Sequence, residues 1–266
     1  MIHLKKTFSY DHPVEEADVV LVGIPFDYTE IGAPVRYGPL FIREAIKNVV
    51  GHDPNSGVNI FEKYKFTDLG DVEVVPGNWK LTQEAILDTV KFVYEKRTPV
   101  TCFLGGDHLI TLGVLESLAQ FHDKITVIHF DAHRDLLPEW MGEKYSHITW
   151  ANHILNNPKF ELVQIGCRSW DKSEDITGVS EEIKKTDNPV YITVDMDVFD
   201  PAYAPEVGTP EPLGMKPEEF FSHLKKACEN RVIGFDIVEC ASQKVNTNTA
   251  LLAAYVFKNI LINLQP

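Results

Sequence analysis

Short apolar runs and longer helical stretches alternate along this sequence of 266 residues. The apolar runs predict six β-strands, at residues 18–24, 100–104, 125–130, 162–166, 190–194 and 231–238. Apolar positions at helical spacing predict four α-helices, at residues 82–95, 109–121, 217–229 and 249–264. This alternation predicts an α/β fold in which a mostly parallel sheet is covered by helices on both faces.

The organisation of the chain favours a single domain over residues 1–266. The length suits one large α/β domain or two small ones. There is no internal repeat, low-complexity tract or convincing linker, and the turn-rich segment at residues 51–57 is short.

Charge and composition narrow the classes of partner. Hydrophobic residues make up 44% of the chain and charged residues 24%, which is an ordinary globular balance. The formal net charge of −14 argues against nucleic acid or an anionic membrane as a partner, and it is compatible with a small cationic substrate. No apolar run approaches the roughly 20 residues of a membrane span.

The cysteines indicate a reducing compartment. Cys102, Cys167, Cys228 and Cys240 are scattered and include no CxxC pair, so they are expected to be free thiols. Residues 1–10 contain no apolar core of a signal peptide. Both observations predict a cytoplasmic protein.

Chemically active side chains gather where the predicted strands end. Asp131 follows the strand at 125–130, Asp195 follows the strand at 190–194, and Glu239 follows the strand at 231–238. His108 lies just beyond a fourth strand, after two glycines. Open α/β sheets bind ligands at the carboxyl ends of their strands, so we expect one edge of the sheet to carry a site.

Six residues at or just after these strand ends are of types that bind metal ions: His108, Asp131, His133, Asp135, Asp195 and Asp197. Alternate residues of an extended segment point to one side. Asp131, His133 and Asp135 would therefore form one cluster, and Asp195 and Asp197 would form a second. Carboxylates mixed with imidazoles suit manganese, and to a lesser degree iron, cobalt or zinc. Aspartate is also common in surface turns, but isolated turn residues do not explain three ligands in alternation directly after an apolar strand. Two divalent cations roughly 3.5–4 Å apart would activate water for hydrolysis.

These motifs resemble the ureohydrolase family, which includes arginase and agmatinase. The resemblance rests mainly on GGDH at 105–108, FDAHRD at 130–135, VDMDVFDP at 194–201 and GTPEP at 208–212. Weaker matches at 38–45 and 249–250 extend it over nearly the whole chain. It implies a three-layer α/β/α sandwich with a parallel central sheet and a homo-oligomer, commonly a trimer or hexamer.

The resemblance also implies a centre of two Mn²⁺ ions. One ion would be held by His108, Asp131, Asp135 and Asp195. The other would be held by His133, Asp131, Asp195 and Asp197, so that Asp131 and Asp195 bridge the two. The reaction would be hydrolysis at a guanidinium carbon, which releases urea and an amine.

Further residues match catalytic positions of the family. His147 would pass a proton to the leaving amine, and Glu239 would pair with the guanidinium of the substrate. A paired loop histidine and an ordinary strand-end glutamate are the alternatives for these two. Asp107 is expected to hold a ligand by a hydrogen bond, and His129 is expected to be a paired core histidine.

The substrate is less sharply indicated than the reaction. Residues 136–141 (LLPEWM) are largely apolar where the family has a polar stretch, which favours a substrate without an α-carboxylate, such as agmatine. Cleavage of agmatine would give putrescine and urea, a step of polyamine biosynthesis. Leu213 replaces the first of two family glycines, and residues 240–243 (CASQ) replace a proline-containing run, so the pocket differs from that of relatives.

Several alternatives stay open. The substrate could be that of a guanidinobutyrase, an arginase or a formimidoylglutamase. The chain could also be a metal-binding paralogue without activity. A phosphoesterase with two metals is disfavoured because the expected site rim is acidic, with Glu139, Glu143 and Glu211.

Overall fold

The computed structural model describes residues 11–28, 32–97 and 99–265, so the predicted absence of a signal peptide at residues 1–10 lies outside the described part. Its centre is a sheet of seven strands in the order β2-β1-β3-β7-β6-β4-β5, and every neighbouring pair is parallel. The strands are β1 (Val19–Ile24), β2 (Phe66–Asp71), β3 (Val100–Gly105), β4 (Ile125–Phe130), β5 (Phe160–Ile165), β6 (Val190–Asp195) and β7 (Val232–Val238).

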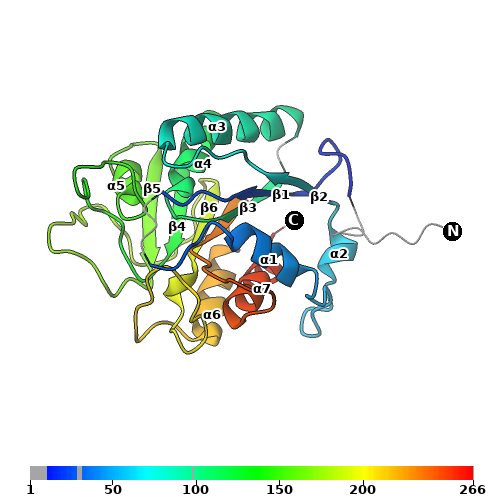
Figure 1. Ribbon diagram of the computed structural model, residues 1–266. Helices are drawn as coiled ribbons and strands as arrows, with labels where there is room; N and C mark the ends of the chain where they lie inside the picture. The colour runs from blue at the N-terminus through cyan, green and yellow to red at the C-terminus, as the bar shows by residue number, and fades with distance from the viewer. Residues whose placement is uncertain (1–10, 29–31, 98, 266) are drawn as a thin grey trace.

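Helices cover both faces of this sheet. They are α1 (Gly38–Ile46), α2 (Ile60–Lys63), α3 (Trp79–Lys96), α4 (Ile110–Leu118), α5 (Trp150–Leu155), α6 (Pro217–Ala227) and α7 (Asn248–Asn263), with a 3-10 turn η1 (Met196–Val198) after β6. Helices α3, α4 and α5 lie on one face, and α1, α6 and α7 lie on the other (Figure 1). The predicted α/β/α sandwich is confirmed.

Side chains of each strand divide between two cores. In β1, Val19 and Leu21 pack into the core under α1 and α7, whereas Val20 and Val22 pack into the core under α3 and α4. Because both faces of the sheet are buried, its strands are continuous apolar runs rather than alternating ones. This is why apolar runs alone located six of the seven strands.

The elements that the apolar pattern did not predict are β2 and the helices α1, α2 and α5. Strand β2 is the edge strand beside β1, and its last three residues are largely exposed. An edge strand with a polar outer half carries no apolar run to recognise. The fold therefore has one strand more than the sequence indicated.

Two compositional expectations can be compared with the described residues. The four cysteines there are free thiols, as expected. No helix in the described ranges is long and apolar enough to cross a membrane.

The strand order determines where a site can form. Strands β3, β7, β6 and β4 are adjacent in the middle of the sheet, and all run in the same direction. Their carboxyl ends therefore meet at one edge. The residues at or just beyond these ends include His108, Glu239, Asp195 and Asp131.

Candidate metal centre

A tight turn after β3 delivers His108 to the centre of the sheet edge. The N–H groups of Gly106 and Asp107 donate to the carbonyls of Ile24 and Phe26 at 3.0 and 2.8 Å, so the turn is hydrogen-bonded to the end of β1. A Cβ atom on Gly106 would lie 2.1 Å from the Phe26 carbonyl oxygen. Only glycine fits this close approach, which explains the glycine before the Asp107–His108 pair.

The first group of candidate ligands surrounds the His108 imidazole. Its Nδ1 lies 3.1 Å from Asp131 Oδ2, 3.4 Å from Asp135 Oδ2 and 3.2 Å from Asp195 Oδ2. All four residues are at most 5% exposed. Within the described chain this nitrogen is buried and forms no hydrogen bond, although three carboxylate oxygens lie around it.

The second group is built on His133. Its Nδ1 lies 3.0 Å from Asp197 Oδ2 and 3.5 Å from Asp131 Oδ1, so Asp131 belongs to both groups. The N–H groups of Ala132 and Asp197 orient the carboxylates of Asp197 and Asp195 at 3.0 and 2.8 Å. The side chain of His133 is 22% exposed and lies on the open side of the cluster.

The negative charge buried in this cluster favours the binding of cations. Burial raises the pKa of Asp135, Asp195 and Asp197, and the carboxylate of Asp131 raises each of them further. Burial acts in the same sense on Asp131, but His129 and the other imidazoles around it outweigh burial and lower its pKa. Four buried carboxylates at this spacing repel one another unless positive charge lies between them. The donor set therefore fits divalent metal ions.

A buried network below the site fixes the tautomer of His108. Its Nε2 lies 2.9 Å from Thr193 Oγ1, and the Thr193 hydroxyl donates to Asp236 Oδ1 at 2.5 Å. A hydroxyl has one proton, so Thr193 must accept from the N–H of His108. Nε2 therefore carries a proton, which leaves Nδ1 as the nitrogen that could bind a metal ion. Burial lowers the pKa of this imidazole, but the carboxylates of Asp131 and Asp195 outweigh burial and raise it. Asp236 is fully buried and also accepts from the hydroxyls of Tyr191 and Thr111, at 2.8 and 2.9 Å.

Two further aromatic residues form hydrogen bonds to the candidate ligands Asp131 and Asp135. His129 is buried and paired, as expected, but its partner is Asp131, whose Oδ2 lies 2.7 Å from Nε2. The amide of Gln164 lies 3.1 Å from the other ring nitrogen. Trp150 donates from Nε1 to Asp135 Oδ2 at 2.8 Å and packs on His108 at 4.7 Å between ring centroids.

Glu239 faces the same centre from the end of β7. It has a left-handed backbone conformation, with φ at 60°, and its Oε1 accepts the N–H of His108 at 2.8 Å. A Cβ on Gly208 would lie 2.6 Å from Glu239 Oε2, so the glycine leaves room for this carboxylate. Burial, then the charge of Asp107, raises the pKa of Glu239.

His147 lies beside Asp107 at the edge of the cluster. Its Nδ1 is 3.9 Å from Asp107 Oδ2, and its side chain is 15% exposed. The carboxylate of Asp107 accepts the N–H of Leu109 at 2.8 Å and that of Tyr28 at 3.4 Å. Asp107 thus contacts two backbone groups and His147, whereas the expectation was a hydrogen bond to a metal ligand.

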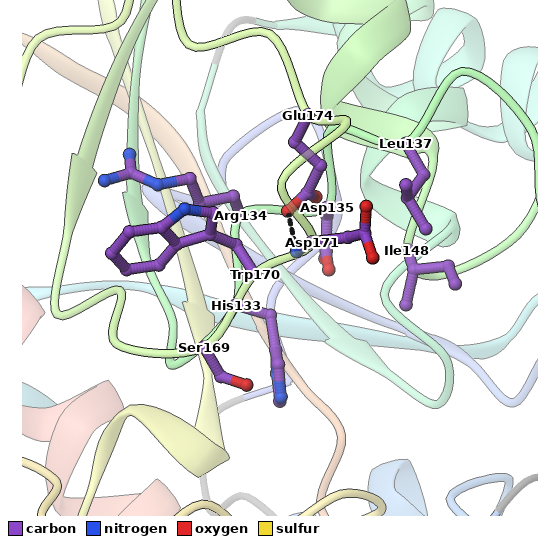
Figure 2. A pocket seen from close by; sticks show the side chains of 9 residues that line it. All are labelled: His133, Arg134, Asp135, Leu137, Ile148, Ser169, Trp170, Asp171 and Glu174. Carbon is purple, nitrogen blue, oxygen red and sulfur yellow. Dashed lines mark hydrogen bonds between the residues drawn. The ribbon is translucent and has the colours of Figure 1, made fainter.

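A cavity of about 180 Å³ is lined by the candidate ligands His133 and Asp135 (Figure 2). Leu137 and Ile148 form an apolar part of its wall, and Asp171 and Glu174 lie at another side. The carboxylate of Glu174 accepts the N–H groups of Leu136 and Asp171, both at 2.8 Å. Figure 2 shows the second of these bonds and the Trp170 ring, 4.6 Å from the guanidinium of Arg134.

Arg168 connects the loop at 209–214 to the segment that carries Asp195 and Asp197. Its guanidinium donates to the carbonyls of Asp197 and Glu211 at 2.7 and 2.8 Å and to that of Pro212 at 3.0 Å. Leu213, the residue that departs from the family pattern, has φ at 62° and is 91% exposed. The substitution therefore places a leucine in a conformation that favours glycine.

Comparisons of the sequence and of the fold with known proteins find relatives along nearly the whole chain. The sequence profile of the arginase family matches residues 17–179 and 174–262. An uncharacterized 32.2 kDa protein of Methanothermus fervidus is 35% identical over 92% of this chain and 91% of its own. The N(1)-aminopropylagmatine ureohydrolase of Thermococcus kodakarensis is 33% identical, over 94% and 92% of the two chains. The crystal structure of agmatine ureohydrolase from Thermoplasma volcanium is similar with a TM-score of 0.84 and 29% identity, over 99% of this chain and 95% of the other.

Proposed function

The chain belongs to the arginase family and is a ureohydrolase, and on that premise we propose that it cleaves agmatine to putrescine and urea at a binuclear manganese centre. The observation that carries the proposal is the convergence of six buried or half-buried candidate ligands at the carboxyl ends of β3, β4 and β6. Glu239 and His147 lie beside them and would supply a partner for the guanidinium and a proton carrier.

Manganese suits this donor set, because carboxylate oxygens and imidazole nitrogens together match its preferences. His108, Asp131, Asp135 and Asp195 would hold one ion. His133, Asp131, Asp195 and Asp197 would hold the other. When bound, two divalent ions would supply a water acidified to near-neutral pKa and positive charge for the transition state.

The side chains of the protein would orient the substrate and move its protons. Glu239 would accept two N–H donors of the planar guanidinium, a geometry that a carboxylate matches bidentately. His147 would deliver a proton to the leaving nitrogen as its bond to the guanidinium carbon breaks. Asp107 Oδ2, 3.9 Å from Nδ1 of this ring, would help to orient it.

Agmatine is supported as the substrate by the relatives and by the pocket wall. Similar proteins include chains named agmatinase, such as that of Bacillus anthracis at 31% identity over 95% of this chain. Leu137 and Ile148 line the cavity beside the ligands, and apolar side chains suit a methylene chain.

A substrate panel tests the proposal. The manganese-loaded protein is assayed for urea or formamide with agmatine, arginine, guanidinobutyrate and formimidoylglutamate. Agmatine is expected to give the highest kcat/KM, by at least tenfold. A higher value for any other member would overturn agmatine as the substrate, and no product from any of them would overturn the proposed function.

A further inference from the structure

A row of buried polar side chains crosses the sheet below the candidate ligands. Its members are register partners in neighbouring strands: Gln164 of β5, His129 of β4, Thr193 of β6 and Asp236 of β7. All are at most 2% exposed. Register partners in a parallel sheet present their side chains to the same face, which here is the face covered by α3, α4 and α5. One half of the row supports His108, and the other half, Gln164 with His129, lies next to Asp131.

The partners of Gln164 fix the orientation of its amide. Nε2 donates to the Arg134 carbonyl oxygen at 2.7 Å, and Oε1 accepts from the Arg134 guanidinium at 3.2 Å. A carbonyl oxygen can only accept a hydrogen bond and a guanidinium can only donate one, so a flipped amide would lose both bonds. Nε2 also lies 3.1 Å from Nδ1 of His129, which leaves its second N–H to donate to that nitrogen.

This donor selects the tautomer of His129. Because Nδ1 accepts from Gln164, it carries no proton, and the N–H of the ring is on Nε2. That N–H donates to Asp131 Oδ2 at 2.7 Å. The other tautomer would present an N–H to the Gln164 amide and a lone pair to the carboxylate, so both contacts would be repulsive.

The orientation of Asp131 matters to both groups of candidate ligands. Its Oδ2, which accepts from His129, lies 3.1 Å from His108 Nδ1. Its Oδ1 accepts the N–H of His133 at 2.5 Å and lies 3.5 Å from Nδ1 of the same residue. Each oxygen thus faces a different group, and one hydrogen-bond donor fixes each of them.

Gln164 also anchors the chain between two candidate ligands. Arg134 lies between His133 and Asp135, and both its carbonyl and its guanidinium are bonded to Gln164. The guanidinium also donates to Glu181, whose side chain is 66% exposed, at 2.6 Å. The network therefore runs from the surface to the carboxylate that the two groups share.

We propose that Gln164 is a positioning residue of the metal centre, which holds His129 in the tautomer that donates to Asp131. The inference rests on the proposed function, because it requires two metal ions at Asp131. Loss of the Gln164 donor weakens the binding of both ions, since Asp131 belongs to both groups. This separates it from the Thr193–Asp236 half of the row, which acts on His108 and hence on one group.

Calorimetric titration with Mn²⁺ tests this consequence. Gln164→Met has a similar length but no donor and no added charge, and it is expected to weaken the binding of both ions about 10- to 100-fold. Glu181→Gln is the matched control, because it changes the surface end of the same network and leaves the contact between Gln164 and His129 in place. It is expected to keep both affinities within threefold of the wild type. Unchanged affinities in Gln164→Met would overturn the inference.

A double-mutant cycle separates selection of the tautomer from anchoring of the chain. His129→Gln offers an amide N–H near the position of Nε2, so its donor does not depend on a tautomer. In that background, Gln164→Met is expected to weaken Mn²⁺ binding less than threefold. The same fold loss in both backgrounds would show that Gln164 acts through Arg134 instead, and it would overturn the inference.

Nuclear magnetic resonance reads the tautomer without any assay of activity. Two-bond proton–nitrogen spectra of isotope-labelled histidines, recorded on protein loaded with diamagnetic Zn²⁺, show which nitrogen of each ring carries the proton. The signals of His129 are those absent from His129→Gln. The wild type is expected to carry the proton on Nε2, and Gln164→Met is expected to shift toward the form protonated on Nδ1.

A proton on Nδ1 of His129 in the wild type would overturn the inference, even if no variant folds. If no guanidino compound is cleaved, the proposed function fails. The metal affinities and the tautomer still decide the role of Gln164 in that case.

Discussion

At the scale of single residues, Leu213 has a strained backbone conformation, and its side chain is too exposed for packing to offset the strain. Its φ of 62° is in the left-handed region, and 91% of the residue is exposed. A leucine side chain costs roughly 1–2 kcal/mol in this conformation, whereas glycine adopts it freely. A Cβ atom on the adjacent Gly214 would lie 2.5–2.7 Å from atoms of Asp200, Phe199 and Arg168, so the loop has little freedom to relax.

Leu213→Gly is therefore expected to raise the free energy of unfolding by about 0.5–1 kcal/mol, after subtraction of the entropy that glycine adds to the unfolded chain. Urea denaturation of both proteins measures the change. Leu213→Ala is the matched control, because alanine keeps a Cβ in the same conformation and should give no comparable gain. Equal stabilisation by glycine and alanine would show that backbone strain is not the cause.

Glu239 gives a second prediction at this scale. Glu239→Gln keeps an oxygen that can accept the N–H of His108 but removes the negative charge proposed to face the guanidinium. Loss of one member of a buried charge pair costs about 2–5 kcal/mol, so kcat/KM for agmatine is expected to fall about 30- to 5,000-fold. Metal content, measured by elemental analysis, should stay at the wild-type value. A fall of less than threefold would contradict the proposed role.

Alternation within one short segment made the candidate ligands predictable from sequence. Asp131, His133 and Asp135 are spaced two apart after an apolar strand, so their common side follows from backbone geometry. Trp150 could not be assigned in this way. It reaches Asp135 only because α5 packs beside the sheet in the folded chain, and a tryptophan in a helix gives the same signal when it is only part of the core.

At the scale of elements, neighbouring strands β6 and β7 support the candidate ligand His108 from below. Thr193 and Asp236 are paired across these two strands, and together they hold the Nε2 proton of His108. Neither residue was identified from the sequence, because each lies inside an apolar run whose other members pack in the core. The register between the strands, which single runs do not reveal, brings them together.

Asp236→Asn is expected to weaken manganese binding about 10- to 100-fold, the usual effect of losing a group that orients a ligand. An asparagine amide can present a donor to the Thr193 hydroxyl, which would release the constraint on the His108 tautomer. Competition titration against a metal-sensitive dye measures the affinity.

Tyr191→Phe is the matched control for this prediction. It removes another hydrogen bond to Asp236 without touching the link to His108. Stability should fall by about 1–3 kcal/mol while manganese affinity stays within threefold of the wild type. If both variants weaken metal binding equally, the effect comes from general loosening of the strands rather than from the tautomer.

The burial and composition of each element explain whether the apolar pattern of the sequence predicted it. Strand β4 was predicted with its observed ends, because both of its faces are buried and its neighbours are polar. Strand β2 was missed because only its first half is buried at the edge of the sheet. Helix α1 has nine residues and begins with Gly38 and Pro39, which give a weak helical signal on their own.

At the scale of the whole molecule, the sheet topology concentrates negative charge at one edge. Four adjacent parallel strands end there, and the resulting carboxylates are buried by the loops that follow them. The fold thus brings together groups that repel one another when no cation is present. Metal ions that bind the folded state but not the unfolded state would stabilise the entire sandwich by mass action.

Removal of metal is therefore expected to lower the thermal stability of the protein. At a free manganese concentration 100 times the Kd, binding contributes about 2.7 kcal/mol, which corresponds to roughly 5–10 °C in Tm for a chain of this size. Calorimetric scans before and after treatment with a chelator, and again after manganese is restored, measure the shift. Asp195→Asn removes one charge from the cluster and should abolish most of the manganese-dependent shift. A wild-type Tm that responds neither to the chelator nor to manganese would contradict metal binding at these residues, because burial of four unneutralised carboxylates cannot leave the folding equilibrium indifferent to cations.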